Sequence, residues 1–144
     1  MRKLALMAAK KKGMNGGALV EFALVLPLLL TLVFGIVEFS VVLYDKAVMT
    51  NASREAARAG VIFRTPALTD AEIMAVATNA CANHLISFGN ATPTVTLSRT
   101  GGSTAGNPLT VTVSYPFTGL MLGNLIGPLF GSNAITATTT MVYE

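Results

Sequence analysis

Few residues in this sequence have the types and the spacing that catalysis or metal binding requires. Cys81 and His84 lie three positions apart in a segment of helical pattern, so both could face one metal ion. A stable metal site needs several such ligands, and the chain contains one cysteine and one histidine. It contains no Gly-Lys-Ser/Thr phosphate loop and no Gly-x-Ser-x-Gly nucleophile elbow. The sequence therefore predicts no enzyme, no catalytic residue, and no metal or cofactor site.

One carboxylate stands in an unusual place. Glu21 lies at the edge of the most apolar part of the chain, directly before residues 22–37, which carry no charge. A carboxylate deep in a bilayer costs about 2.5–3.5 kcal/mol on an insertion scale, and less near the interface. Such an acid needs a partner, although a side chain that only reaches the lipid headgroups is the simpler interpretation.

The apolar stretch is long enough to cross a membrane. It extends to Tyr44 when Glu38 is accepted near its end, and about 20 apolar residues span a bilayer as a helix. A buried core helix is the alternative, but the rest of the chain is too small to cover such a helix on all sides. We therefore expect a membrane helix over residues 17–44.

The positive charges orient this helix. Five of the ten Lys and Arg residues lie within the first twelve positions, and the rest of the chain carries five basic and seven acidic residues. An excess of Lys and Arg before a membrane helix places its N-terminus in the cytoplasm and the following part outside. The body of the protein lacks the basic patch of a nucleic-acid binder, so we expect no nucleic-acid partner.

The residues around Glu21 resemble a known processing signal. Residues 16–22 (GGALVEF) are similar to the class III signal of type IV pilins and pseudopilins. The resemblance implies that a membrane aspartyl peptidase, the prepilin peptidase, cuts after Gly16, so that Glu21 becomes the fifth residue of the mature chain. A cut after Gly17 would make it the fourth, which fits less well. Three longer motifs follow: EFALVLPLLL at residues 21–30, GIVEF at 35–39 and ASREAARA at 52–59. Over about residues 13–60 the chain thereby resembles the TadE-like family of minor pilin-like proteins of the tight-adherence (Tad) pilus.

Cleavage would also give Glu21 a partner. The new α-amino group at Gly17 would lie four positions before Glu21, so the two charges would share one helix face. Pairing lowers the cost of each charge in lipid. The amine could belong to the same chain or to a neighbouring subunit, and the family resemblance favours the neighbour.

The resemblance implies a function as well. It predicts a pseudopilin or minor pilin that crosses the bacterial inner membrane once, is cut by the prepilin peptidase, and takes part in assembly of an adhesive type IV (Tad or Flp-like) pilus. Its partners would be that peptidase, other pilins or pseudopilins, the Tad assembly platform and membrane lipid. The alternative is an uncleaved single-pass protein that acts as a partner or regulator of a membrane secretion complex.

Four parts of the chain are expected. Residues 1–16 form a basic leader, 17–44 the membrane helix, 45–64 its extracytoplasmic continuation and 65–144 a small pilin-like head. One continuous helix is expected from about residue 18 to residue 63, because the part after the membrane is rich in alanine.

The head should be of the α+β class, with a second helix and a three-stranded antiparallel sheet. Thr69 and Glu72 form a capping box that opens the second helix, and Phe88 and Gly89 mark its expected end. Alternating apolar residues, with threonine on the wet face, predict strands at 94–98, 109–115 and 135–143. Such a sheet needs helices against its inner face.

Two further surfaces are candidates for contact. Glu38, Arg54 and Arg58 could meet lipid headgroups or a partner, and a solvated helix face is the simpler alternative for the two arginines. The apolar segment 117–130 is too short to span a bilayer. It either covers the core as a loop or docks on the outer leaflet or the next subunit, through Leu122, Leu125 and Ile126.

Overall fold

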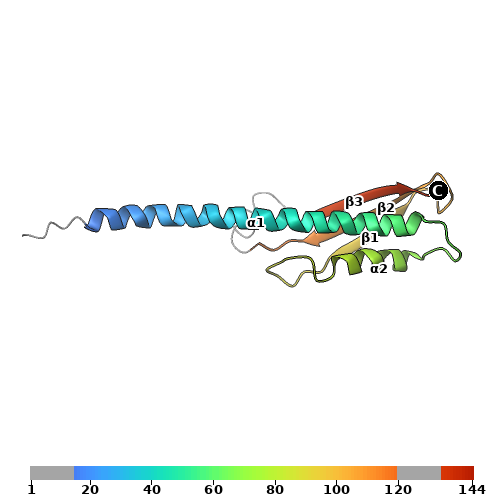
Figure 1. Cartoon of the computed structure of the whole chain (residues 1–144), viewed down its shortest axis with the longest axis horizontal. Helices are drawn as coiled ribbons and strands as arrows, with labels where there is room; N and C mark the ends of the chain where they lie inside the picture. Colours follow the sequence, from blue (N-terminus) through green and yellow to red (C-terminus); the bar gives the residue numbers. More distant parts are fainter. Residues whose placement is uncertain (1–14, 120–133) are drawn as a thin grey trace, which may run out of the picture. The chain divides into compact units, whose positions relative to one another are not determined.

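A computed structural model of the chain describes residues 15–119 and 134–144. The chain divides into two compact units, Met1–Val33 and Phe34–Glu144. The first unit holds the N-terminal part of helix α1 (Asn15–Val61), and the second holds the rest of that helix and all other elements. These are helix α2 (Asp70–Cys81) and strands β1 (Thr94–Arg99), β2 (Pro108–Pro116) and β3 (Ala134–Val142) (Figure 1). The predicted α+β class is confirmed.

Helix α1 is continuous from Asn15 to Val61, close to the predicted bounds. Pro27 lies inside it and removes one backbone donor. Two hydroxyl groups in the apolar part bond within the helix. Thr31 Oγ1 donates to the Pro27 carbonyl at 2.8 Å, and Ser40 Oγ donates to the Ile36 carbonyl at 2.7 Å. These bonds suit a helix in lipid, where an unsatisfied polar group is costly.

Helix α2 begins where the capping box predicts. Thr69 Oγ1 accepts a hydrogen bond from the Glu72 N–H at 3.3 Å, and the Thr69 N–H donates to Glu72 Oε2 at 2.8 Å. The bond from the Thr69 N–H is the main reason that the pKa of the Glu72 carboxyl lies below its ordinary value. The reciprocal pair satisfies two backbone donors that the first turn of a helix leaves free.

The end of helix α2 differs from the prediction. We expect a helix that runs to Phe88 and Gly89, but α2 ends at Cys81. The backbone turns at Asn83, which has a φ of 62°, and the His84 N–H donates to the Cys81 carbonyl at 3.1 Å. Asparagine tolerates this left-handed conformation, so the chain leaves the helix well before the glycine.

The three strands form one antiparallel sheet in the order β1-β2-β3, in which each strand pairs with the next along the chain. Their bounds lie within two residues of the predicted ones. One face of β2 is buried, through Leu109, Val111, Val113 and Tyr115. The opposite face carries threonines that bond across strands: the Oγ1 atoms of Thr110 and Thr140 lie 2.9 Å apart. The predicted alternation is confirmed.

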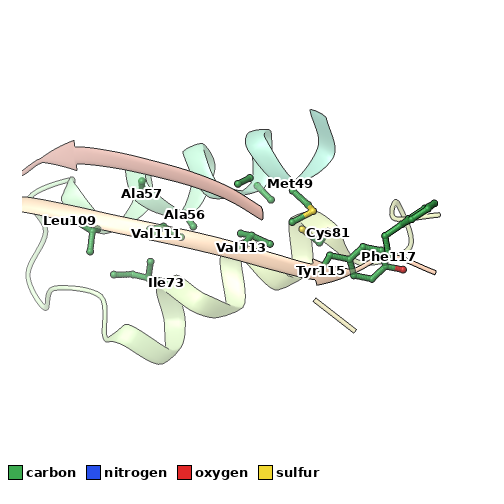
Figure 2. Packing of buried hydrophobic residues seen from close by; sticks show 13 residues of the cluster. Met49, Ala56, Ala57, Ile73, Cys81, Leu109, Val111, Val113, Tyr115 and Phe117 are labelled. Carbon is green, nitrogen blue, oxygen red and sulfur yellow. The ribbon is translucent and has the colours of Figure 1, made fainter. Parts of the chain in front are cut away.

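The core of the second unit lies between this inner face and the two helices (Figure 2). Helix α1 contributes mainly small residues, and Ser53 Oγ lies 2.7 Å from Thr139 Oγ1 of β3. At Gly60 there is little room for a side chain, because an added Cβ would lie 2.5 Å from Leu109 Cδ2 and 2.8 Å from Ile73 Cδ1. The buried residues of the two helices are Met49, Ala52, Ala56 and Ala57 of α1 and Ile73, Ala77 and Cys81 of α2.

The contacts define two ends of this second unit. At the far end, the last turns of α1 meet the start of α2 at Gly60 and Ile73, and the end of β1 meets α2. At the near end, where α1 enters the unit, Asp45 contacts the segment that follows α2, and Lys46 contacts the start of β3. Residues 82–93 and 117–119 therefore lie at the near end.

Candidate functional site

The predicted processing site lies at the start of α1. Gly16 and Gly17 are exposed, and a Cβ added at either one would meet no other atom within 4 Å. Glu21 is also exposed and follows Gly17 by four positions in an unbroken helix, so the two residues share a helix face. Packing within the described chain therefore does not require glycine at positions 16 and 17.

The apolar part of α1 is exposed to its surroundings on all sides. The helix is long and apolar enough to cross a membrane, and its most apolar window is 0% buried within the protein. Exposed apolar area costs about 25 cal/mol per Å² in water, so this surface favours lipid or other apolar helices. A core helix of a soluble protein would be covered, and this helix therefore suggests a single-pass membrane anchor.

Two carboxylates of α1 are buried in the second unit. Glu38 is 5% exposed and Asp45 is 0% exposed. Seven positions separate them, so they lie on one helix face, which Met49 and Ala52 continue. Glu38 is a predicted contact for lipid headgroups or a partner, and its burial leaves little of its side chain for that contact.

Asp45 fastens the segment after α2 to α1. Its Oδ1 accepts a hydrogen bond from the Ile86 N–H at 2.9 Å, whereas Oδ2 has no hydrogen-bond partner within the described chain. Burial raises the pKa of the Asp45 carboxyl, and the bond from Ile86 offsets part of that rise. The next residue, Lys46, donates from Nζ to the Thr136 carbonyl. One turn of α1 thus holds two separate parts of the near end.

Arg54 and Arg58 are exposed and lie one turn apart on α1. Arg58 borders a hollow of about 440 Å³ at the far end, together with Glu144. The structure does not bring Glu38 to these arginines, because Glu38 lies toward the near end. The remaining lining of the hollow is apolar and consists of Val61, Ile62, Met141 and Val142.

Cys81 and His84 do not come together as a binding site. Cys81 is buried in the core (Figure 2), and this burial raises the pKa of its thiol. His84 is exposed, and its Nδ1 lies 2.7 Å from the Ala82 carbonyl oxygen. Within residues 15–119 and 134–144 there is no group of three or more His, Cys, Asp or Glu side chains that could hold a metal ion.

Sequence reasoning missed Asp45 and the segment that it holds. The spacing of Glu38, Asp45 and Ala52, seven positions apart each time, was the signal that could have placed both acids on the buried face of α1. Ile86 and Phe88, exposed in the segment that follows α2, carried no comparable signal. The predicted docking residues Leu122, Leu125 and Ile126 lie outside the described residues.

Comparison with known protein families supports the predicted resemblance. Residues 16–58 match the model of the family described as TadE-like protein. Comparisons with curated proteins and with solved structures give no match. The matched segment runs from the predicted processing site to Arg58 and is helical throughout. The family suggests a pilin-like protein associated with the Tad pilus. Helix α1 thus carries the sequence pattern of the TadE-like family, and the predicted resemblance to that family is confirmed.

Proposed function

We propose that this chain is a minor pilin or pseudopilin that is cut after Gly16 by the prepilin peptidase and takes part in assembly of an adhesive Tad pilus. The observation that carries the proposal is an unbroken helix with an uncovered apolar surface, which presents Gly17 and Glu21 on one face at its start. The family match over residues 16–58 supports the same assignment.

Cleavage would turn the start of α1 into a charge pair. Removal of residues 1–16 leaves a protonated amine on Gly17, about one helical turn from the Glu21 carboxylate. In lipid either charge alone is unfavourable, so an exposed Glu21 attracts an amine, including that of a neighbouring subunit. Such a pair would set the register between two helices as a subunit is incorporated.

The uncovered glycines support recognition by another molecule. Neither Gly16 nor Gly17 is required by packing within the described chain, and glycine lowers the stability of a helix by up to about 1 kcal/mol. A peptidase that binds the backbone closely at the cleavage site would leave no room for side chains there, which would explain the two glycines. The five basic residues that precede them favour a cytoplasmic N-terminus and therefore a cut on the cytoplasmic side of the inner membrane.

The apolar surface of α1 would contact lipid first and other pilin helices later. Lipid covers it while the subunit waits in the membrane, and other pilin helices cover it after incorporation through the assembly platform. Lipid and other pilin helices both cover this leucine-rich surface with apolar atoms. Transfer from one to the other therefore needs little change in the subunit itself.

N-terminal sequencing of the membrane-extracted protein tests the processing step. In cells that contain the prepilin peptidase, the mature chain should begin at Gly17, and in cells without it the chain should keep Met1 or Arg2. A Gly16→Val variant should remain uncut, because the backbone at the cleavage site is no longer open to the enzyme.

Gly17→Ala is the matched control, since it changes the neighbouring glycine and leaves Gly16 in place. It should still be cut, and its mature chain should begin with the substituted alanine. A wild-type chain that keeps its leader in the presence of the peptidase would contradict the proposal. That result would favour the uncleaved single-pass partner or regulator of a membrane secretion complex.

A further inference from the structure

The charged residues of the second unit are distributed unevenly between its ends. From Ile73 to Tyr143 the sequence contains a single Asp, Glu, Lys or Arg, which is Arg99. It lies at the far end, where its Nη2 is 2.6 Å from Asp70 Oδ1. All other charged residues after Lys46 lie between positions 54 and 72 or at position 144. Residues 82–93 and 117–119, which lie at the near end, contain no Asp, Glu, Lys or Arg.

Of the three charged side chains toward the near end, the two carboxylates are buried, whereas Lys46 is exposed and bonded. Asp45 is fully buried and accepts the bond from Ile86, and Glu38 is 5% exposed. The Lys46 ammonium bonds to the Thr136 carbonyl. Surface segments of soluble proteins usually carry charge, so an end whose carboxylates are buried and whose one exposed ammonium is bonded to a carbonyl is suited to a less polar surrounding than water.

Two large apolar side chains project from this end. Ile86 is 44% exposed and Phe88 is 48% exposed. Their backbones are held by bonds to other elements: the Ile86 N–H donates to Asp45 Oδ1 at 2.9 Å, and the Phe88 N–H donates to the Thr118 carbonyl at 3.3 Å. The segment 86–88 is therefore tied through its backbone to α1 and to residue 118 while its apolar side chains are exposed.

This surface lies beside the part of α1 that leaves the membrane. At 1.5 Å per residue, residues 17–44 extend about 42 Å, which matches the 40–45 Å of a bilayer with its headgroups. Asp45, which binds Ile86, is the next residue. Within the second unit, α1 also exposes Phe39, Leu43 and Tyr44 in the two turns before Asp45, so this stretch of the helix adds exposed apolar side chains near the same end.

We propose that the near end docks on the outer surface of the membrane, with Ile86 and Phe88 at the boundary between the lipid headgroups and the acyl chains. The inference rests on the proposed membrane insertion of α1. Aromatic and aliphatic side chains are favoured at this depth, whereas the charged far end faces water. Docking would restrict the orientation of the head before the subunit is incorporated.

Site-directed spin labelling of the full chain tests the contact. A Cys81→Ala background removes the native thiol, and single labels are placed through Phe88→Cys, Phe63→Cys and Leu28→Cys. Phe63 is the matched control, because it is a phenylalanine that is 87% exposed at the far end. Leu28, exposed in the apolar part of α1, reports on the span itself. The protein is reconstituted in vesicles of phosphatidylethanolamine and phosphatidylglycerol.

The readout is the accessibility of each label to oxygen, which concentrates in lipid, and to a water-soluble nickel chelate. At position 88 oxygen should exceed nickel severalfold, as at position 28, whereas at position 63 nickel should exceed oxygen. Ile86→Cys should repeat the result for position 88, which guards against a local disturbance at one site.

Each other outcome has a distinct meaning. A label at position 88 that behaves like the label at position 63, with position 28 still in lipid, overturns the docking and leaves the proposed function intact. A label at position 88 that is shielded from both reagents shows protein contact, such as a second copy, and also overturns the docking on lipid. A label at position 28 in water overturns the span and both proposals with it.

Discussion

At the scale of residues, the Asp45 carboxyl bonds the segment after α2 to helix α1, and the burial of its charged form costs free energy. Its Oδ1 is bonded to the Ile86 N–H while the whole side chain is buried, and burial raises its pKa. The folded state thus holds a proton more tightly at Asp45 than the unfolded chain does. Its contribution to stability is complete below the unfolded pKa, near about pH 4, and is lost as the pH rises through the raised folded value.

An Asp45→Asn variant should therefore be more stable than the wild type at about pH 7. The amide oxygen can still accept the bond from Ile86, and no charge is buried. The dependence of stability on pH above about pH 4 should also become weaker. Thermal unfolding in detergent micelles over a pH series measures both effects.

Glu55→Gln is the control for this prediction, because Glu55 is an exposed carboxylate on the same helix. It should leave the unfolding temperature and its pH dependence unchanged. An Asp45→Asn variant that is less stable than the wild type at neutral pH would show that the ionised carboxylate stabilises the fold.

At the scale of elements, α1 is one helix with two surfaces of different kind. Its N-terminal part is apolar on every side, whereas its C-terminal part presents small residues to the sheet. Small side chains allow a helix to approach closely, and a side chain at Gly60 would have to displace the ends of the Leu109 and Ile73 side chains. The end of α1 is therefore more sensitive to added volume than its exposed face.

Gly60→Val should destabilise the head by about 1–3 kcal/mol, because its added atoms meet two fully buried side chains. Ala47→Val, at an exposed position of the same helix, should cost about 0.5 kcal/mol through helix propensity alone. Chemical unfolding of the two variants in detergent measures the difference. Equal losses would mean that the α1–α2–sheet contact at Gly60 is looser than the distances indicate.

The elements that local patterns determine were predictable, and those that depend on distant contacts were not. The capping box of Thr69 and Glu72 and the alternation of β2 act over a few residues, so the sequence alone located them. Helix α2 ends before the turn at Asn83, where the backbone is left-handed. Glycine is the more usual residue after the end of a helix, so the sequence alone predicts a later end at Gly89. The place of Ile86 depends on a bond to a residue 41 positions away, which no local pattern encodes.

At the scale of the whole molecule, the resemblance predicted the class of protein while the structure added the ends of its head. The family match stops at residue 58, so the pairing of strands and the two ends of the second unit come from the structure alone. Composition could not reveal that Arg99 lies at the far end of the second unit, because that depends on the directions in which α2 and β1 run.

Assembly is a property of the whole molecule, and it should depend on Glu21. In Glu21→Ala the protein should still enter the membrane, since removing a carboxylate favours insertion. Pilus formation should fall about ten-fold or more, which corresponds to a loss of ~1.4 kcal/mol in a subunit contact. Alkaline extraction measures the membrane fraction, and the mass of sheared pili measures assembly.

Glu21→Asp keeps the charge and should retain more of the assembly than Glu21→Ala. A normal yield of pili from Glu21→Ala would remove the charge pair from the mechanism.

If the head is exported as in the proposed function, the bonds that tie α1 to β3 also set an order of events during export. Lys46 pairs with a residue 90 positions later, and Ser53 with one 86 positions later. Helix α1 is therefore in place long before its last partner has crossed the membrane. The three strands can form a meander among themselves, but contacts of such long separation form slowly. Until β3 arrives, the inner faces of helix and sheet lie open at the outer surface, where they are prone to aggregation. The arrival of the last strand is thus the step that completes the subunit.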